Sequence, residues 1–302
     1  MVRQLVAACG AVVTVMMLIP PADASRDSTW SEWSTPVNLG AGINTSFSEA
    51  APAISEDGLT LYFVSNRPGA PPDAFGDNDL YVARRDSVDL PWDSPVNLGA
   101  TINTAAADGN PALSRNEHHL FFTRNPGDIW VSYRKSVHDD VGDLGWQLPV
   151  PLGPGVNTSD AEFGPAYLEN RKRGLPQLFF TRPRPGSAFA DIYVAEAFGS
   201  AVPVAELNST GNDARPSLAA DGLEIFFHSN RPGSAGNDVY SSVRKSVLEP
   251  WSEPRTLGMV VNSAASDFLV TISPDGETLF FTSTRDGGFG SNDIYMTTRT
   301  KH

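Results

Sequence analysis

Five carboxylates recur at one position of the sequence and are its clearest candidates for chemistry. Each lies five residues after an asparagine that threonine or serine follows. Acids gathered from different repeats could act as the acid and base of a glycoside hydrolase, or as oxygen ligands for a cation such as calcium. The pairs are Asn44 and Glu49, Asn103 and Asp108, Asn157 and Glu162, Asn208 and Asp213, and Asn262 and Asp267.

Arginines near the second apolar run of each repeat offer a structural explanation for these acids. We expect them on the same face as the acids, where each ion pair would compensate a partly buried charge. Repetition favours this interpretation, because an acid and a base need different environments and one environment is repeated here. The arginines are Arg67, Arg124, Arg184, Arg231 and Arg285.

Residues that differ between repeats are the better place to look for function. Asp160 and Phe163 flank Glu162, Arg215 follows Asp213 by two residues, and Phe268 follows Asp267. The predicted binding face therefore comprises the acids and arginines above with Asn44, Asn103, Asn157, Phe163 and Arg215. Phe163 and Phe268 could equally pack between repeats. If the protein hydrolyses glycans, the candidate catalytic acids are Glu49, Asp108, Asp160 and Glu162; pairing of each acid with its own arginine would weaken that hypothesis.

Metal chemistry has weak support in the sequence. The segment 66–78 contains Asp73 and Asp77, and Asp79 directly follows it. Their oxygens could bind calcium, but the spacing of an EF-hand is absent. The histidines show no ligand spacing typical of zinc. We therefore expect no cofactor, with calcium as the remaining option.

Internal repetition predicts the elements that position these residues. A proline recurs at Pro36, Pro95, Pro149, Pro203 and Pro254, at steps of 59, 54, 54 and 51 residues. It follows a tryptophan by three residues in every copy except that of Pro203, where Ser200 takes the place of the tryptophan. Each unit holds four short apolar runs separated by turn residues, without helical periodicity. The first run is predicted to begin three residues after the acid, and the Trp-x-x-Pro segment is predicted to be the fourth strand. Five units of four antiparallel strands predict an all-β, five-bladed propeller.

The two ends of the chain are predicted to close the ring. The last unit ends after its third strand, near Arg299, whereas the segment from Trp33 to Leu39 is a fourth strand with no blade before it. The N-terminal strand would therefore complete the last blade and leave no open gap in the ring.

Residues 1–24 have the pattern of a secretory signal peptide, with Arg3, an apolar run and an Ala-x-Ala ending. The predicted propeller then spans residues 25–302, which contain no cysteine. We expect an exported protein, periplasmic or secreted, that does not insert into the membrane after cleavage and is a monomer. The formal net charge of −13 disfavours nucleic acid as a partner.

The order of Trp-x-x-Pro, Asn-Thr, Asp-Gly, Leu-Tyr-Phe, Ser-Asn-Arg-Pro-Gly and Asp-Leu-Tyr-Val resembles the WD40-like PD40 repeats of TolB-type propellers. The resemblance covers essentially the whole predicted mature chain. It implies an exported, non-enzymatic binding or scaffold module whose funnel and loop face meet a protein or a cell-envelope glycan. A glycan-active hydrolase that uses the funnel carboxylates is the alternative.

Overall fold

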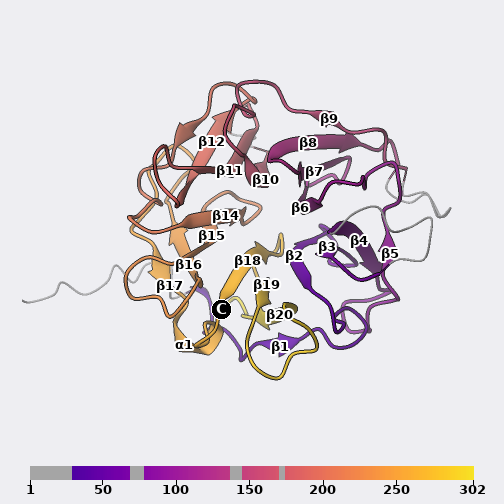
Figure 1. Ribbon diagram of the computed structural model, residues 1–302. Coiled ribbons are helices and arrows are strands. Elements are labelled where there is room, and N and C mark those ends of the chain that lie inside the picture. The colour runs from indigo at the N-terminus through magenta and orange to yellow at the C-terminus, as the bar shows by residue number, and fades with distance from the viewer. Residues whose placement is uncertain (1–28, 69–77, 137–144, 170–173) are drawn as a thin grey trace, which may run out of the picture.

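The computed structural model describes residues 29–68, 78–136, 145–169 and 174–302. These form five four-stranded antiparallel sheets arranged as blades around a central axis, which confirms the predicted five-bladed propeller (Figure 1). Residues 1–24, the predicted signal peptide, lie outside the described residues. Within the described ranges, no helix has both the length and the apolar character needed to cross a membrane.

Four strands build each blade from the axis outward. The innermost strands are β2 (Glu49–Ile54), β6 (Asp108–Leu113), β10 (Phe163–Leu168), β14 (Asp213–Leu218) and β18 (Asp267–Ile272). The second strands are β3 (Thr60–Ser65), β7 (His119–Arg124), β11 (Gln177–Pro183), β15 (Glu224–Ser229) and β19 (Thr278–Ser283). The third strands are β4 (Asp79–Arg84), β8 (Asp128–Tyr133), β12 (Ala190–Glu196), β16 (Asp238–Val243) and β20 (Asp293–Thr298).

The outer strands have only two residues each: β5 (Val96–Asn97), β9 (Val150–Pro151), β13 (Val202–Pro203), β17 (Arg255–Thr256) and β1 (Val37–Asn38). The prediction that the Trp-x-x-Pro segment is itself the fourth strand is therefore wrong. Its tryptophan instead covers an arginine that follows the third strand; the guanidinium carbon of Arg134, for example, lies 4.5 Å from the ring centre of Trp146. A four-residue helix, α1 (Gly258–Val261), follows β17.

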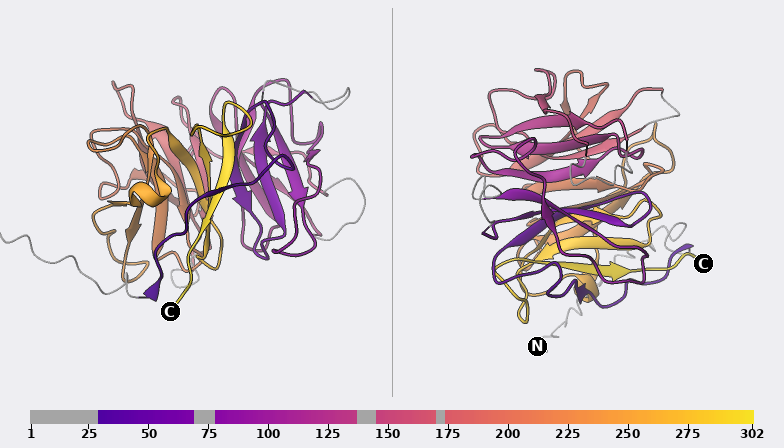
Figure 2. Two further views of the ribbon diagram at one scale, coloured as in Figure 1. Left: turned by 90° about the horizontal axis from the view of Figure 1, so that it is seen from below. Right: turned by 90° about the vertical axis from the view of Figure 1, so that its right-hand side faces the viewer.

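The chain ends close the ring as predicted. β1 pairs antiparallel with β20, so that the fifth blade has the order β1-β20-β19-β18. An isolated bridge between Trp30 and Lys301 continues this pairing. Figure 2 shows the N-terminal segment lying alongside the last strand of the chain.

Paired aromatic residues on the second strands hold adjacent blades together. Neighbouring side chains on a strand point to opposite faces, so each pair fills two different junctions. Phe226 lies in the cluster between blades four and five, whereas Phe227 lies in the cluster between blades three and four. Each of the five buried apolar clusters likewise joins two adjacent blades. The core of this protein is therefore the set of blade interfaces.

The innermost strands begin at or beside the repeated acid, earlier than predicted. The acid opens β2, β6, β14 and β18, and the proline expected to start the strand lies inside β2, β6, β10 and β14. A central proline is tolerated because this strand is an edge strand facing the axis. Each innermost strand contains a register shift and one residue with positive φ: Ala51, Asn110, Gly164, Arg215 and Leu269.

Candidate functional site

The repeated asparagines join each linker to the blade that precedes it. Asn103 donates through Nδ2 to the carbonyl of Leu80, at 3.0 Å, and accepts through Oδ1 from the Leu80 N–H, at 2.9 Å. The other four asparagines make the same two bonds with Ile294 (Asn44), Ile129 (Asn157), Ile192 (Asn208) and Val239 (Asn262). A side chain thus continues the backbone pairing of strand three.

The repeated acids hold the same linker from the other side. The carboxylate of Asp108 accepts from the N–H and the hydroxyl of Thr104, at 2.7 and 2.9 Å. Equivalent bonds join Glu49 to Thr45, Glu162 to Thr158, Asp213 to Ser209 and Asp267 to Ser263. All five acidic side chains are fully buried.

Every repeated acid pairs with an arginine, as the structural interpretation predicts. The N–O distances run from 2.6 to 3.2 Å for Glu49–Arg67, Asp108–Arg124, Glu162–Arg182, Asp213–Arg231 and Asp267–Arg285. Each guanidinium also donates to the carbonyl just before the repeated asparagine. We call this acid–arginine set the clamp ring, and it fastens the linker between blades.

Blade three corrects one predicted pairing. Arg182, within β11, pairs with Glu162 at 2.8 Å, whereas Arg184 pairs with Asp191 at 2.5 Å. Arg182 and Arg124 reach the acid directly from the second strand. In blades one, four and five a serine occupies that strand position, and the arginine comes from two residues later; in blade four these are Ser229 and Arg231.

The other predicted residues of this face do not form a catalytic pair with the ring. Asp160 is exposed, and its N–H donates to the Thr158 hydroxyl. Phe163 is half-buried at the start of β10, and Phe268 meets the ring of His228 edge-on at 6.0 Å. Because the ring acids are buried and already bonded, they are poor candidates for proton transfer to a ligand.

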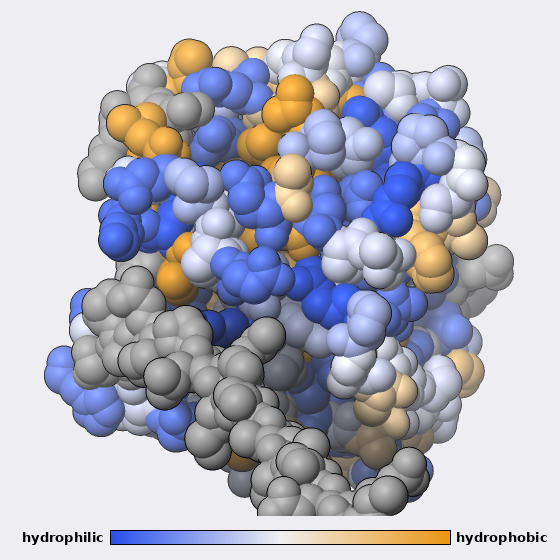
Figure 3. Space-filling model, turned by 90° about the vertical axis from the view of Figure 1, so that its left-hand side faces the viewer, coloured by the Kyte–Doolittle hydropathy of each residue, from blue (hydrophilic) through white to orange (hydrophobic). Residues whose placement is uncertain are grey.

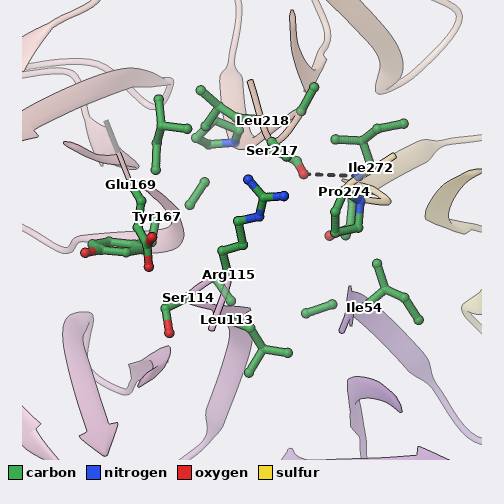
Figure 4. A pocket seen from close by; sticks show the side chains of 18 of the residues that line it. Ile54, Leu113, Ser114, Arg115, Tyr167, Glu169, Ser217, Leu218, Ile272 and Pro274 are labelled. Carbon is green, nitrogen blue, oxygen red and sulfur yellow. Dashed lines mark hydrogen bonds between the residues drawn. The ribbon is translucent and has the colours of Figure 1, made fainter. Parts of the chain in front are cut away.

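The opposite end of the inner strands surrounds an axial cavity of about 320 Å³ (Figure 4). Its size falls at the lower end of the range typical of small-molecule sites, roughly 300–1,000 Å³. Apolar residues such as Pro111, Pro165 and Ile272 line it together with the polar side chains of Arg115, Tyr167 and Glu169. Figure 4 shows the Arg115 side chain extending from blade two into the middle of the cavity, with Tyr167 and Glu169 to one side.

Two carboxylates of the cavity differ in their partners. Glu56 of blade one accepts from Arg115, with N–O distances of 2.8 and 2.9 Å, and both side chains are more than a third exposed. Glu169 of blade three is half-buried and has no ion pair among residues of the described ranges. These acids are accessible, unlike those of the clamp ring, and sequence reasoning missed them because they lie in the turns after the innermost strands.

Arg215 reaches the same cavity from β14, although its side chain is almost fully buried. The backbone N–H of Arg215 donates to the Thr181 hydroxyl, at 2.9 Å. Burial lowers the pKa of Arg215 to about 9. Its Nη1 has no hydrogen-bond partner among the residues that the structure describes.

His228 plays a structural part at the next blade junction. Its Nδ1 accepts from the N–H of Leu269, at 3.3 Å, as threonine hydroxyls do for Ala51, Gly164 and Arg215. Burial lowers the pKa of His228 to about 3, helped by the positive charge of Arg215 and opposed by Asp213. The neutral ring is the form that can accept this bond.

Asp238 is the acid on the clamp-ring face whose pKa departs from its ordinary value. Burial raises the pKa, the charge of Asp267 raises it further, and the N–H groups of Ala235 and Gly236 oppose the shift. In blades one and five an asparagine of the outer strand bonds the corresponding acid, whereas blade four has Thr256 there. One buried oxygen of Asp238 has no hydrogen-bond partner among the described residues.

The calcium hypothesis gains no support from the described part of the chain. Asp73 and Asp77 lie outside the described residues, while Asp79 accepts from Asn97 at 3.0 Å. Within the described ranges, no group of three His, Cys, Asp or Glu side chains is placed to hold a metal ion.

The chain shares its fold with glycoside hydrolase structures. It matches a thermostable family-43 glycoside hydrolase with a TM-score of 0.56 and 13% identity, covering 89% of this chain and 92% of the other. A GH62 hydrolase in complex with xylotriose matches with a TM-score of 0.53 and 9% identity, covering 89% and 97%. The GH43_1 enzyme from Xanthomonas citri complexed with xylotriose matches with a TM-score of 0.50 and 14% identity, covering 87% and 89%. No family model and no curated protein matches the chain.

These likenesses correct the resemblance drawn from the sequence. The solved structures named above are glycoside hydrolases whose fold this chain shares, and none of them is a WD40-like PD40 or TolB-type repeat protein. The repeated motifs reflect how a blade is built and joined, which different propellers can share. The prediction of a non-enzymatic binding or scaffold protein relied on that resemblance and is wrong by the same comparison. The alternative of a glycan-active hydrolase agrees better with these similar structures.

Proposed function

We propose that the protein is a glycan-active hydrolase whose saccharide binds in the axial cavity. The observation that carries the proposal is a cavity of about 320 Å³ in a fold that known glycoside hydrolases share. It presents an arginine, a tyrosine and accessible carboxylates from three blades, Glu56, Glu169 and Asp221. Tyr167 lines the cavity with its ring stacked on Phe121 at a centroid distance of 4.9 Å, and its hydroxyl is a polar group that suits a sugar.

Glu56 and Glu169 are the proposed catalytic pair. In hydrolysis the acid gives its proton to the glycosidic oxygen as the bond to the anomeric carbon breaks, and the second carboxylate takes a proton from the attacking water. Glu169, which has no cationic partner among the described residues, is assigned the acid role, and Glu56, paired with Arg115, is assigned the base role. Two carboxylates in different environments are what this chemistry requires.

The test is release of reducing ends from a panel of neutral and uronate-bearing polysaccharides. Glu56→Gln and Glu169→Gln should each reduce turnover by at least about a hundredfold. Glu206→Gln is the matched control, because Glu206 is exposed and does not line the cavity, and it should leave turnover unchanged. Activity that survives both cavity substitutions would exclude this site.

A further inference from the structure

Arg215 is a buried cation without a compensating anion in the described structure. Its side chain is 2 % exposed, its Nη1 has no partner among the described residues, and it takes part in no ion pair there. A buried charge is normally paired, because removing it from water costs free energy that only an opposite charge or strong hydrogen bonds offset. The net charge of −13 makes an isolated buried arginine still less expected of this chain.

The neighbouring blade makes room for this arginine. A Cβ added to Gly164 would lie 2.8 Å from Cδ of Arg215, so a larger residue there would collide with the side chain. Arg215 and Gly164 occupy the same repeat position in adjacent blades, and both have positive φ. Arg215 thus lines the cavity from one blade, and Gly164 of the adjacent blade leaves the space that the stem of its side chain occupies.

The cavity around Arg215 also limits the kind of anion that fits. Pro111, Pro165 and Pro216 contribute apolar walls near it, while Arg115 and Tyr167 lie on the same lining. Of the acids that line the cavity, Glu56 pairs with Arg115, Asp221 accepts from the backbone N–H of Leu223, and Glu169 forms no ion pair among the described residues. A planar guanidinium binds a carboxylate through two parallel hydrogen bonds. A cavity volume of about 320 Å³ leaves space for the rest of the molecule that carries this carboxylate.

We propose that Arg215 binds the carboxylate of an acidic sugar in the axial cavity, so that the substrate class is uronate-bearing glycans. This inference rests on the proposed function. Arg215 acts as an anchor that orients the sugar, while Glu56 and Glu169 perform the chemistry.

The experiment is isothermal titration of the full chain with sodium glucuronate, glucose and sodium acetate. Arg215→Leu and Arg215→Ala are suitable variants, since the chain places leucine and alanine at this repeat position, with the same sign of φ, at Leu269 and Ala51. Arg84→Leu removes one positive charge from an exposed site and is the control.

Glucuronate should bind the wild type at least about tenfold more tightly than glucose, and either Arg215 variant should weaken it by at least about tenfold. Arg84→Leu should bind like the wild type. Absence of glucuronate binding, or binding unchanged by both Arg215 variants, overturns the proposal. Acetate binding as tightly as glucuronate would show a site for free carboxylates and would also overturn the sugar assignment.

The outcomes separate this inference from the proposed function. Arg215-dependent glucuronate binding without cleavage of any polysaccharide would retain the anchor and reject the hydrolase. Cleavage of a neutral glycan at an equal rate by wild type and Arg215→Leu would retain the hydrolase and reject the anchor.

Discussion

Substitution of one clamp-ring acid tests whether the ring is architectural. Glu162→Gln keeps the shape of the side chain but removes its charge. The carboxylate of Glu162 accepts hydrogen bonds from Thr158 and Arg182, with donor–acceptor distances of 2.6 to 3.0 Å. In the variant, the NH₂ group of glutamine would itself be a donor facing these donors. Arg182, only 12% exposed, would lose its anion.

The expected cost is about 3–5 kcal/mol of unfolding free energy, since breaking a buried pair leaves an uncompensated charge. In a domain of this size the same loss lowers the Tm by roughly 6–20 °C. The measurement is urea denaturation at pH 7, followed by fluorescence, with the midpoint and slope compared between variants.

Glu56→Gln is the matched control for stability, because the same substitution breaks a pair that is more than a third exposed on both sides. It should cost at most about 1 kcal/mol. The reasoning is refuted if Glu162→Gln is as stable as Glu56→Gln, or if the folded Glu162→Gln protein loses turnover while its stability is unchanged.

Three further predictions follow from other junctions. His228→Thr should make the protein less sensitive to acid. The pKa of His228 in the folded protein, about 3, lies below its ordinary value of 6.5, so the stability of the wild type falls as the pH drops through that window, by up to about 1.4 kcal/mol per pH unit. Equal slopes of unfolding free energy against pH in urea titrations of the two proteins would contradict this. Arg215→Leu should raise unfolding free energy at pH 7 by about 1–4 kcal/mol without ligand, measured by thermal melting, and a lower Tm would count against an uncompensated charge. Arg299→Lys should lower the unfolding free energy by about 1–3 kcal/mol more than Arg85→Lys does. Both arginines lie against a tryptophan, but Arg299 also pairs with Glu224 of the adjacent blade. Equal losses of unfolding free energy on denaturation would remove Glu224 from the explanation.

Repetition explains why the architecture could be predicted from the sequence. Five copies of the Asn-Thr element and the aromatic run determine the number of blades, and the unmatched N-terminal segment predicts the closing strand. The clamp ring was also predictable in kind, because a buried acid in every repeat needs a cation in every repeat.

Details that depend on backbone conformation could not be read from residue types. Ala51 and Leu269 are unremarkable in sequence, yet both have positive φ at the bulge of an innermost strand. Arg182 and Arg184 are both near the end of β11, and only the register of the strand decides which one faces Glu162.

The axial cavity was missed for a related reason. Its accessible acids lie in the turns after the innermost strands, where charged residues are common and ordinarily solvated. Only the closing of the ring brings Glu56 and Glu169 from separate blades to one cavity. On the side drawn in Figure 3, exposed apolar side chains are scattered among polar ones.

The most direct test of the hydrolase assignment is the rate at which the purified protein releases reducing ends from uronate-bearing polysaccharide. The account predicts measurable turnover for the wild type and Glu206→Gln, and a loss of at least about a hundredfold in Glu169→Gln with its fold intact. Turnover in Glu169→Gln equal to that of the wild type would contradict the account.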